Sequence, residues 1–159
     1  MKIYYEDSMP YAAEFFSELG ECEVFSHKTI NADMLADADV LLVRSTTKVN
    51  RELLANNKQL QFVATATAGT DHVDQIYLAD QNIPFISAGG CNAVAVAEYV
   101  LSAMLVMGKR LNWKLADKTV GIVGAGHVGS ALARVLTVLG IRNKLCDPPL
   151  ADAGDEREF

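Results

Sequence analysis

The sequence is poor in cysteine and has no cluster of basic residues, and these two deficits exclude several classes of protein. Its three cysteines are widely spaced and form no CxxC pair (Cys22, Cys91 and Cys146). This spacing disfavours a disulfide framework and a zinc site, and it fits the reducing conditions of the cytoplasm. Fourteen Lys and Arg residues against 20 Asp and Glu residues leave a net charge of −6, so nucleic acid is not an expected partner.

The sequence also lacks an apolar run long enough to cross a bilayer. The longest one, Ala93 to Met107, is interrupted by Glu98 and falls short of the roughly 20 residues that a transmembrane helix needs. The N-terminal residues MKIYYEDSMP carry acids where a signal peptide has an apolar core. We therefore expect no membrane partner. Because 50% of the residues are hydrophobic, we expect a packed globular protein.

What the sequence does contain is an alternation of short apolar runs and helical patterns, which is typical of an α/β fold with parallel strands. Strands are predicted at residues 2–5, 23–25, 40–43, 62–64 and 83–86. Helices are predicted after Ser8 up to Gly20, at 31–36, at 50–55, and from Thr70 or Asp71 to about Asp80. This order predicts a flavodoxin-like open parallel sheet in the first part of the chain.

A change of pattern near Gly89 and Gly90 predicts the start of a second domain. The stretch 93–107 is apolar around nearly its whole circumference, and such a helix requires neighbours on several sides. A strand at 119–123, a helix at 128–139 and a strand at 141–146 follow, and the segment after them is polar. We therefore assign residues 1–92 to a substrate domain and residues 93–159 to the first βαβ unit of an incomplete Rossmann domain.

The most specific motif is a GxGxxG sequence placed between the predicted strand 119–123 and the helix that follows it. It consists of Gly124, Ala125, Gly126, His127, Val128 and Gly129. The first glycine allows a tight turn, the second lets the backbone approach a pyrophosphate, and the third permits close packing of helix and strand. The N–H groups at the start of the helix attract the anion. The motif predicts a dinucleotide site that uses the backbone of these residues, and a catalytic role for His127 is disfavoured.

An acidic residue at the end of the next strand completes the dinucleotide fingerprint. Asp147 lies eighteen residues beyond Gly129, where a carboxylate accepts hydrogen bonds from the adenosine ribose and repels a 2′-phosphate. The predicted cofactor is therefore NAD rather than NADP. The competing interpretation is a structural glycine turn followed by an unrelated acid.

Two further loops follow predicted strands and are rich in hydroxyl groups. Arg44 to Lys48 follows strand 40–43, and Thr65 to Asp71 follows strand 62–64. Ligands bind at the carboxyl ends of parallel strands, so both loops are expected to face one crevice that suits a small polyanion. The alternative is that the loops contain only turn residues and helix caps. The run Asp71 to Asp74 is better explained by helix capping than by metal binding, and no metal site is expected.

Several segments together resemble the D-isomer-specific 2-hydroxyacid dehydrogenase family. They are VRSTTKVN, ATATAGTDHVD, GGCNAVAVAEYVLSAML, LADKTVGIVGAGHVG, LCDPP and GDEREF. TAGTDHVD and GxGxxG are typical of the wider family, and VRSTTKVN, GGCNAVAVAEYV and CDPP resemble one of its members. The resemblance extends over the whole chain.

The resemblance implies an oxidoreductase of pyridoxal phosphate biosynthesis that oxidises a small phosphorylated hydroxy acid with NAD, in the cytoplasm and as a homodimer. It places Ser45 and Thr67 at the substrate and Asp147 at NAD. The catalytic Arg, Glu and His of the family lie in a C-terminal half that this sequence does not contain, so no catalytic residue is expected in the chain itself. Two alternatives are a non-catalytic nucleotide- or metabolite-binding module and a fragment without independent function.

Overall fold

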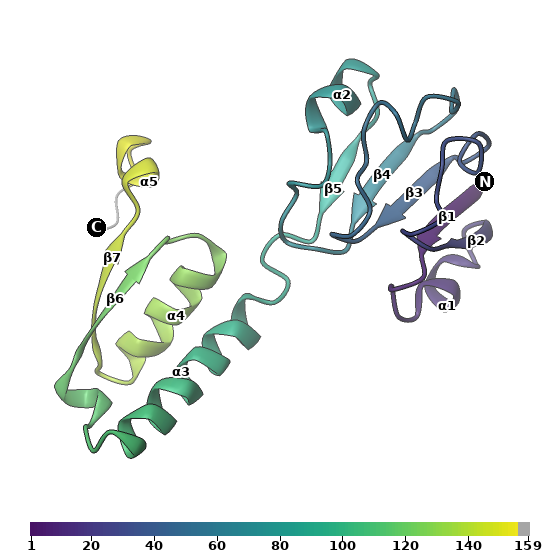
Figure 1. The fold of residues 1–159 in the computed structure, drawn as a ribbon. Coiled ribbons are helices and arrows are strands. Elements are labelled where there is room, and N and C mark those ends of the chain that lie inside the picture. The colour runs from purple at the N-terminus through teal and green to yellow at the C-terminus, as the bar shows by residue number, and fades with distance from the viewer. Residues whose placement is uncertain (156–159) are drawn as a thin grey trace. The chain divides into compact units, whose positions relative to one another are not determined.

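The computed structural model describes residues 1–155 of the chain, which is drawn in Figure 1. The chain divides into two compact units, Met1–Gly89 and Gly90–Phe159, and each is described by itself below. The last four residues of the GDEREF segment lie outside the described residues. The assignment of substrate and cofactor to the two parts of the chain stays a prediction.

The first unit is built on a five-stranded parallel sheet. Its strands are β1 (Lys2–Glu6), β2 (Glu21–Phe25), β3 (Val40–Val43), β4 (Phe62–Thr65) and β5 (Phe85–Ser87). They lie in the order β2-β1-β3-β4-β5, which is the flavodoxin-like order, and every pair is parallel (Figure 1). The predicted α/β class and open parallel sheet are therefore confirmed.

The helices of this unit are shorter than the sequence pattern predicted. The first, α1 (Ala12–Phe16), begins after Tyr11 rather than after Ser8, whose hydroxyl donates to Glu6 instead. The second, α2 (Gln75–Asp80), begins after Asp74, which caps it through the N–H of Tyr77. The predicted start at Thr70 or Asp71 was wrong. The Val73 N–H donates to the Thr70 carbonyl in a turn, and Val73 itself forms a parallel bridge with Val49, so the helix begins only after Asp74.

Two predicted helices, at 31–36 and 50–55, are only turns. In the first segment the Asn31 side chain accepts from two backbone N–H groups, and the backbone bonds that follow span three residues rather than four. In the second, one bond from Leu54 to Asn50 spans four residues and those after it span three. A single helical turn fixes several residues for one hydrogen bond, so such short segments do not extend into helices.

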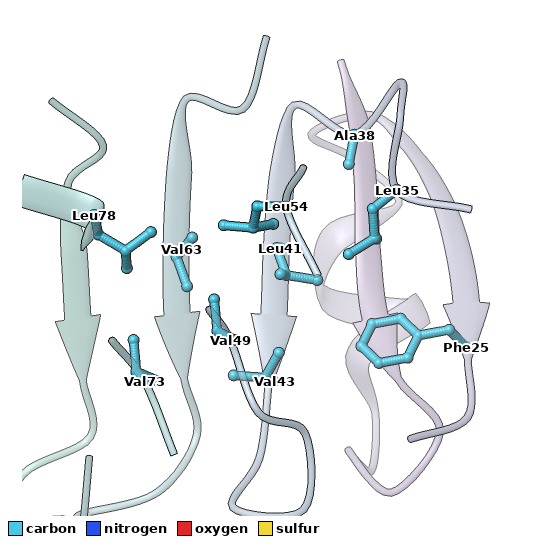
Figure 2. Packing of buried hydrophobic residues seen from close by; sticks show 10 residues of the cluster. All are labelled: Phe25, Leu35, Ala38, Leu41, Val43, Val49, Leu54, Val63, Val73 and Leu78. Carbon is cyan, nitrogen blue, oxygen red and sulfur yellow. The ribbon is translucent and has the colours of Figure 1, made fainter. Parts of the chain in front are cut away.

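Buried side chains from the strands and their connections form the core of the first unit. Figure 2 shows this cluster, which contains Phe25, Leu35, Ala38, Leu41, Val43, Val49, Leu54, Val63, Val73 and Leu78. Side chains from the two turn segments contribute to it as fully as those from the strands. The turns therefore bury apolar surface without being helical.

The second unit contains a long helix and a two-stranded parallel sheet. Its elements are α3 (Ala93–Arg110), the short 3₁₀ helix η1 (Leu115–Asp117), β6 (Thr119–Val123), α4 (His127–Val138), β7 (Arg142–Cys146) and α5 (Pro148–Asp152). β6 pairs with β7, and the predicted βαβ unit is present (Figure 1). α5 lies in the polar segment where the sequence predicted no element.

The long helix α3 buries only part of its apolar surface within the described residues. Ala93, Ala97 and Gly108 are buried, and Val100, Leu101 and Met104 pack against the core of the unit. Five other large side chains are exposed: Val94, Tyr99, Leu105, Val106 and Met107. Within residues 90–155, α3 thus lacks part of the covering that its apolar pattern requires. No described helix is long and apolar enough to cross a membrane.

Candidate functional site

The loop after β3 is held by a buried carboxylate at the end of β1. Glu6 is completely buried and accepts four hydrogen bonds of 2.5–3.0 Å. The donors are the hydroxyls of Ser8, Thr46 and Thr47 and the backbone N–H of Arg44. Because β1 and β3 are adjacent parallel strands, their carboxyl ends bring the acceptor and these donors together.

The hydrogen bonds to Glu6 decide its ionisation. Burial alone raises the pKa of this carboxyl group, but the hydrogen bonds from Thr46, Thr47, Ser8 and Arg44 outweigh burial and lower the pKa to about 2. Glu6 is therefore ionised at neutral pH. The sequence interpretation did not include Glu6, although an acid directly after the predicted strand 2–5 was an available signal.

The loop after β4 contains a chain of hydrogen bonds that ends at a histidine. Thr67 donates its hydroxyl proton to the carbonyl of Gly69 at 2.9 Å, so Thr65 must be the donor in the 2.8 Å contact between the two threonine hydroxyls. The 2.9 Å contact between Thr65 and His72 then requires a proton on His72 Nε2. This proton count assigns the Nε2–H tautomer to His72.

His72 is neutral in this environment. Burial lowers the pKa of its imidazole, while the charges of Glu6 and Asp71 act in the opposite direction without cancelling the effect. The sequence placed His72 in the first turn of a helix, but the structure places it before α2 and in contact with Thr65. His72 is thus a second residue of this region that the sequence did not single out for the substrate site.

Both loops contribute to one open cavity at the carboxyl ends of the strands. Its volume is about 410 Å³, and it is lined by Ser45, Thr46, Lys48, Thr67, Gly69, Asp71 and His72. The structure therefore brings Ser45 and Thr67 together, as the strand order requires. Their role in binding substrate stays a prediction.

The glycine motif forms a tight turn between β6 and α4. Gly124 has a φ of +91°, a backbone conformation that residues other than glycine rarely adopt. A Cβ on Gly129 would lie 1.9 Å from the Gly124 carbonyl oxygen. A Cβ on Gly126 would meet no atom within 4 Å, so this position is open toward solvent or a ligand. Gly124 and Gly129 are thus required by the turn itself, whereas the turn leaves Gly126 unconstrained.

The start of α4 offers backbone donors to an anion. The N–H groups of His127, Val128 and Gly129 have no acceptor among residues 1–155, and Ser130 is the first to bond within the helix, to Gly126. The exposed His127 side chain lies beside Gly90, where an added Cβ would come within 2.8 Å of its imidazole. The arrangement fits a pyrophosphate bound through the backbone. The cofactor roles of these residues stay predictions.

Asp147 follows β7, as predicted, and has structural partners as well. One carboxylate oxygen accepts from the N–H of Ala125 at 2.7 Å, and the other accepts from Leu150 at 3.3 Å and caps α5. Asp147 thus joins the end of β7 to the glycine turn. A carboxylate has about four acceptor positions, so capacity remains for ribose hydroxyls. Its proposed contact with NAD remains untested.

Across residues 1–155 no three His, Cys, Asp or Glu side chains come together in a way that could hold a metal ion. The three cysteines, Cys22, Cys91 and Cys146, are free thiols.

The whole chain is similar in sequence to curated proteins named erythronate-4-phosphate dehydrogenase. It is 67% identical to that of Pseudoalteromonas atlantica and 54% identical to that of Serratia proteamaculans, over 159 residues in both cases. These matches cover 100% of this chain and 42% of each relative. The chain therefore spans less than half the length of the curated relatives that it matches.

Solved structures of longer dehydrogenases contain the same fold. The NAD⁺-bound 3-phosphoglycerate dehydrogenase of Entamoeba histolytica matches with a TM-score of 0.73 and 27% identity, over 93% of this chain and 54% of that one. The D-lactate dehydrogenase of Aquifex aeolicus, solved with NAD and lactic acid, matches with a TM-score of 0.74 and 20% identity, over 91% and 51%. The sequence model of one protein family, the D-isomer specific 2-hydroxyacid dehydrogenase catalytic domain, matches residues 3–144. The chain therefore belongs to this family.

Proposed function

We propose that this chain is the substrate-binding part and the first half of the dinucleotide-binding part of an NAD-dependent dehydrogenase. The proposed reaction oxidises 4-phospho-D-erythronate to 2-oxo-3-hydroxy-4-phosphobutanoate in pyridoxine 5′-phosphate biosynthesis. The observation that carries the proposal is the 67% identity, over all 159 residues, to a relative named for this substrate. A cytoplasmic homodimer is proposed with it.

In this proposal the first unit holds the substrate. The hydroxyls of Ser45 and Thr67 line the cavity, and Lys48 adds a positive charge that favours a phosphorylated acid. Neutral His72 donates to the Thr65 hydroxyl, which in turn donates to the Thr67 hydroxyl. The Thr67 hydroxyl can therefore turn its proton from the Gly69 carbonyl toward an incoming anion and still accept the hydrogen bond from Thr65. These groups bind and orient the substrate.

The second unit holds the cofactor in the same proposal. Open space at Gly126 fits a pyrophosphate, as do the N–H groups of His127, Val128 and Gly129, which have no acceptor in the described part of the chain. Asp147 fits an adenosine ribose. When bound, NAD⁺ supplies the hydride acceptor for the substrate carbon that bears the hydroxyl group. The family resemblance places the Arg, Glu and His that act on the substrate outside this chain, so residues 1–159 alone are expected to be inactive.

The test is an assay of the full-length protein with NAD⁺ and 4-phosphoerythronate, in which the absorbance of NADH measures turnover. We expect turnover with this substrate and much weaker turnover with erythronate, which lacks the phosphate. Failure to reduce NAD⁺ with 4-phosphoerythronate would contradict the proposed reaction. Binding of NAD⁺ without turnover of any hydroxy acid would instead favour a non-catalytic nucleotide-binding module.

A further inference from the structure

Among residues 1–155, no positively charged side chain pairs with the buried carboxylate of Glu6. The ion pairs of residues 1–155 involve Asp37 and Asp39 at the other end of the sheet, and the Arg44 guanidinium donates to the Ser8 carbonyl instead of to Glu6. Burying an unpaired charge is costly unless hydrogen bonds replace its hydration. An apolar side chain at this position would avoid that cost, so the carboxylate calls for an explanation beyond core packing.

Three of the four donors to Glu6 belong to the turn that carries Ser45. They are the Arg44 N–H and the hydroxyls of Thr46 and Thr47, so the carboxylate binds the turn on both sides of the exposed Ser45. The backbone of the turn closes with a single bond of 3.3 Å, from the Thr47 N–H to the Arg44 carbonyl. Glu6, rather than the backbone, is therefore the main fastening of this turn.

We propose that Glu6 is a positioning residue, whose buried carboxylate fixes the turn 44–47 and thereby sets where Ser45 meets the substrate. This inference rests on the proposed function. An ionised carboxylate only accepts hydrogen bonds, so every donor must point inward, and bonds to a charged acceptor are stronger than neutral ones. The N–H groups of Ser45 and Thr46 have no acceptor among residues 1–155, which leaves them free to bind an anion.

Asn57 supplies a matched control at the opposite end of the strands, before β3. Its side-chain amide donates to the carbonyls of Leu35 and Ala38 and so fastens a different turn, which precedes β3. Like Glu6, it joins two segments distant in sequence through several hydrogen bonds. A variant at Asn57 therefore loses fold stability without touching the turn that carries Ser45.

The experiment compares Glu6→Ala, Glu6→Gln and Asn57→Ala in the full-length protein, at a temperature where all three are folded. Glu6→Ala should raise KM for 4-phosphoerythronate at least about tenfold, with KM for NAD⁺ changed by less than about twofold. Glu6→Gln retains an acceptor for Arg44 and Thr47 and gives Ser8 and Thr46 a donor, so it should bring KM back to within about threefold of wild type. Asn57→Ala should lower Tm and leave both KM values unchanged.

Amide hydrogen exchange gives a readout that does not depend on activity. In Glu6→Ala the amides of Arg44 and Thr47 should exchange at least about tenfold faster, whereas Asn57→Ala should leave them unchanged. If wild type turns over 4-phosphoerythronate, the proposed reaction stands. In that case an unaltered KM for this substrate in Glu6→Ala, or an equal rise of that KM in Asn57→Ala, would overturn the positioning role of Glu6. If wild type shows no turnover, the proposed function fails, and unchanged exchange at Arg44 and Thr47 would still refute the fastening of the turn.

Discussion

The two units of the chain form their candidate sites by opposite means. The first unit uses side chains: a buried carboxylate, several hydroxyls and a histidine fix two loops at the ends of β3 and β4. The second uses the backbone, through glycines that let a turn and a helix start approach closely. A side-chain site is sensitive to lost hydrogen bonds, whereas a backbone site is sensitive to an added Cβ.

The units also differ in how their sheets are completed. In the first unit β1, β3 and β4 each have a neighbour on both sides, whereas β6 and β7 pair only with each other among the described residues. Two-stranded sheets are marginal without further packing. The exposed apolar side chains of α3 and the 88% exposed Val123 belong to the second unit, which has the smaller sheet.

The largest expected effect is a difference in stability between the units. In the chain of residues 1–159, the slowest amides of β3 and β4 should exchange at least about 1,000-fold more slowly than those of β6 and β7, because local opening costs less in a small sheet. Hydrogen exchange read by NMR or mass spectrometry measures both at once. Equal protection of the two sheets in a monomer would contradict the comparison.

The backbone site should fail when a methyl group is added at Gly129. Gly129→Ala should lower the unfolding free energy by about 3 kcal/mol or more, because its Cβ would lie 1.9 Å from a carbonyl oxygen that cannot move aside cheaply. Chemical denaturation measures this loss. Gly121→Ala, where an added Cβ meets nothing within 4 Å, is the control for methyl addition.

Gly126→Ala should keep the fold and lose affinity for NAD.

Acid should weaken the side-chain site through Glu6. The pKa of Glu6 falls from an ordinary 4.5 to about 2, so its stabilisation is complete above pH 4.5 and is lost as the pH falls to about 2. The shift corresponds to at most about 3 kcal/mol. Denaturation curves across this pH range should show a steeper fall for wild type than for Glu6→Gln. Parallel curves would show that Glu6 does not titrate as described.

Replacement of Asp147 should reduce the preference for NAD over NADP by about 1–3 kcal/mol, the range for a hydrogen bond to a charged group. Asp147→Asn retains an acceptor for Ala125 and removes only the charge, so it separates cofactor selectivity from the shape of the turn. Steady-state kinetics of the full-length protein with both cofactors measures the effect. Unchanged selectivity would indicate that Asp147 serves only to join β7 to the glycine turn.

The smallest effects are expected from the two hydroxyl groups proposed at the substrate. Ser45→Ala and Thr67→Ala should each cost about 1 kcal/mol in kcat/KM, through a higher KM and without loss of the fold. Kinetics with 4-phosphoerythronate and a thermal unfolding curve test both points. Wild-type kinetics in both variants would support the interpretation that the loops contain only turn residues.

Prediction of secondary structure failed where short apolar segments reach the core from turns. The segments 31–36 and 50–55 have helical spacing of apolar residues, yet Leu35 and Leu54 reach the core from turns. The segment before α2 was predicted to be helical, but it forms a turn between Thr70 and Val73, and Val73 pairs with Val49. In each case the local pattern reported burial correctly. It did not fix the backbone conformation, because a single turn is too short to nucleate a stable helix and because Val73 pairs with a residue distant in sequence.

The sequence alone determined the features that depend on local chemistry. Strands 40–43 and 119–123 have the predicted bounds because continuous β-branched and apolar runs favour parallel strands. The GxGxxG turn followed from the residue types at fixed spacing, since only glycine fits Gly124 and Gly129. Only the tertiary structure decided the roles of Glu6 and His72, because their partners come from other strands and loops. A carboxylate or an imidazole takes its pKa and its proton from those neighbours, and residue type alone does not specify them.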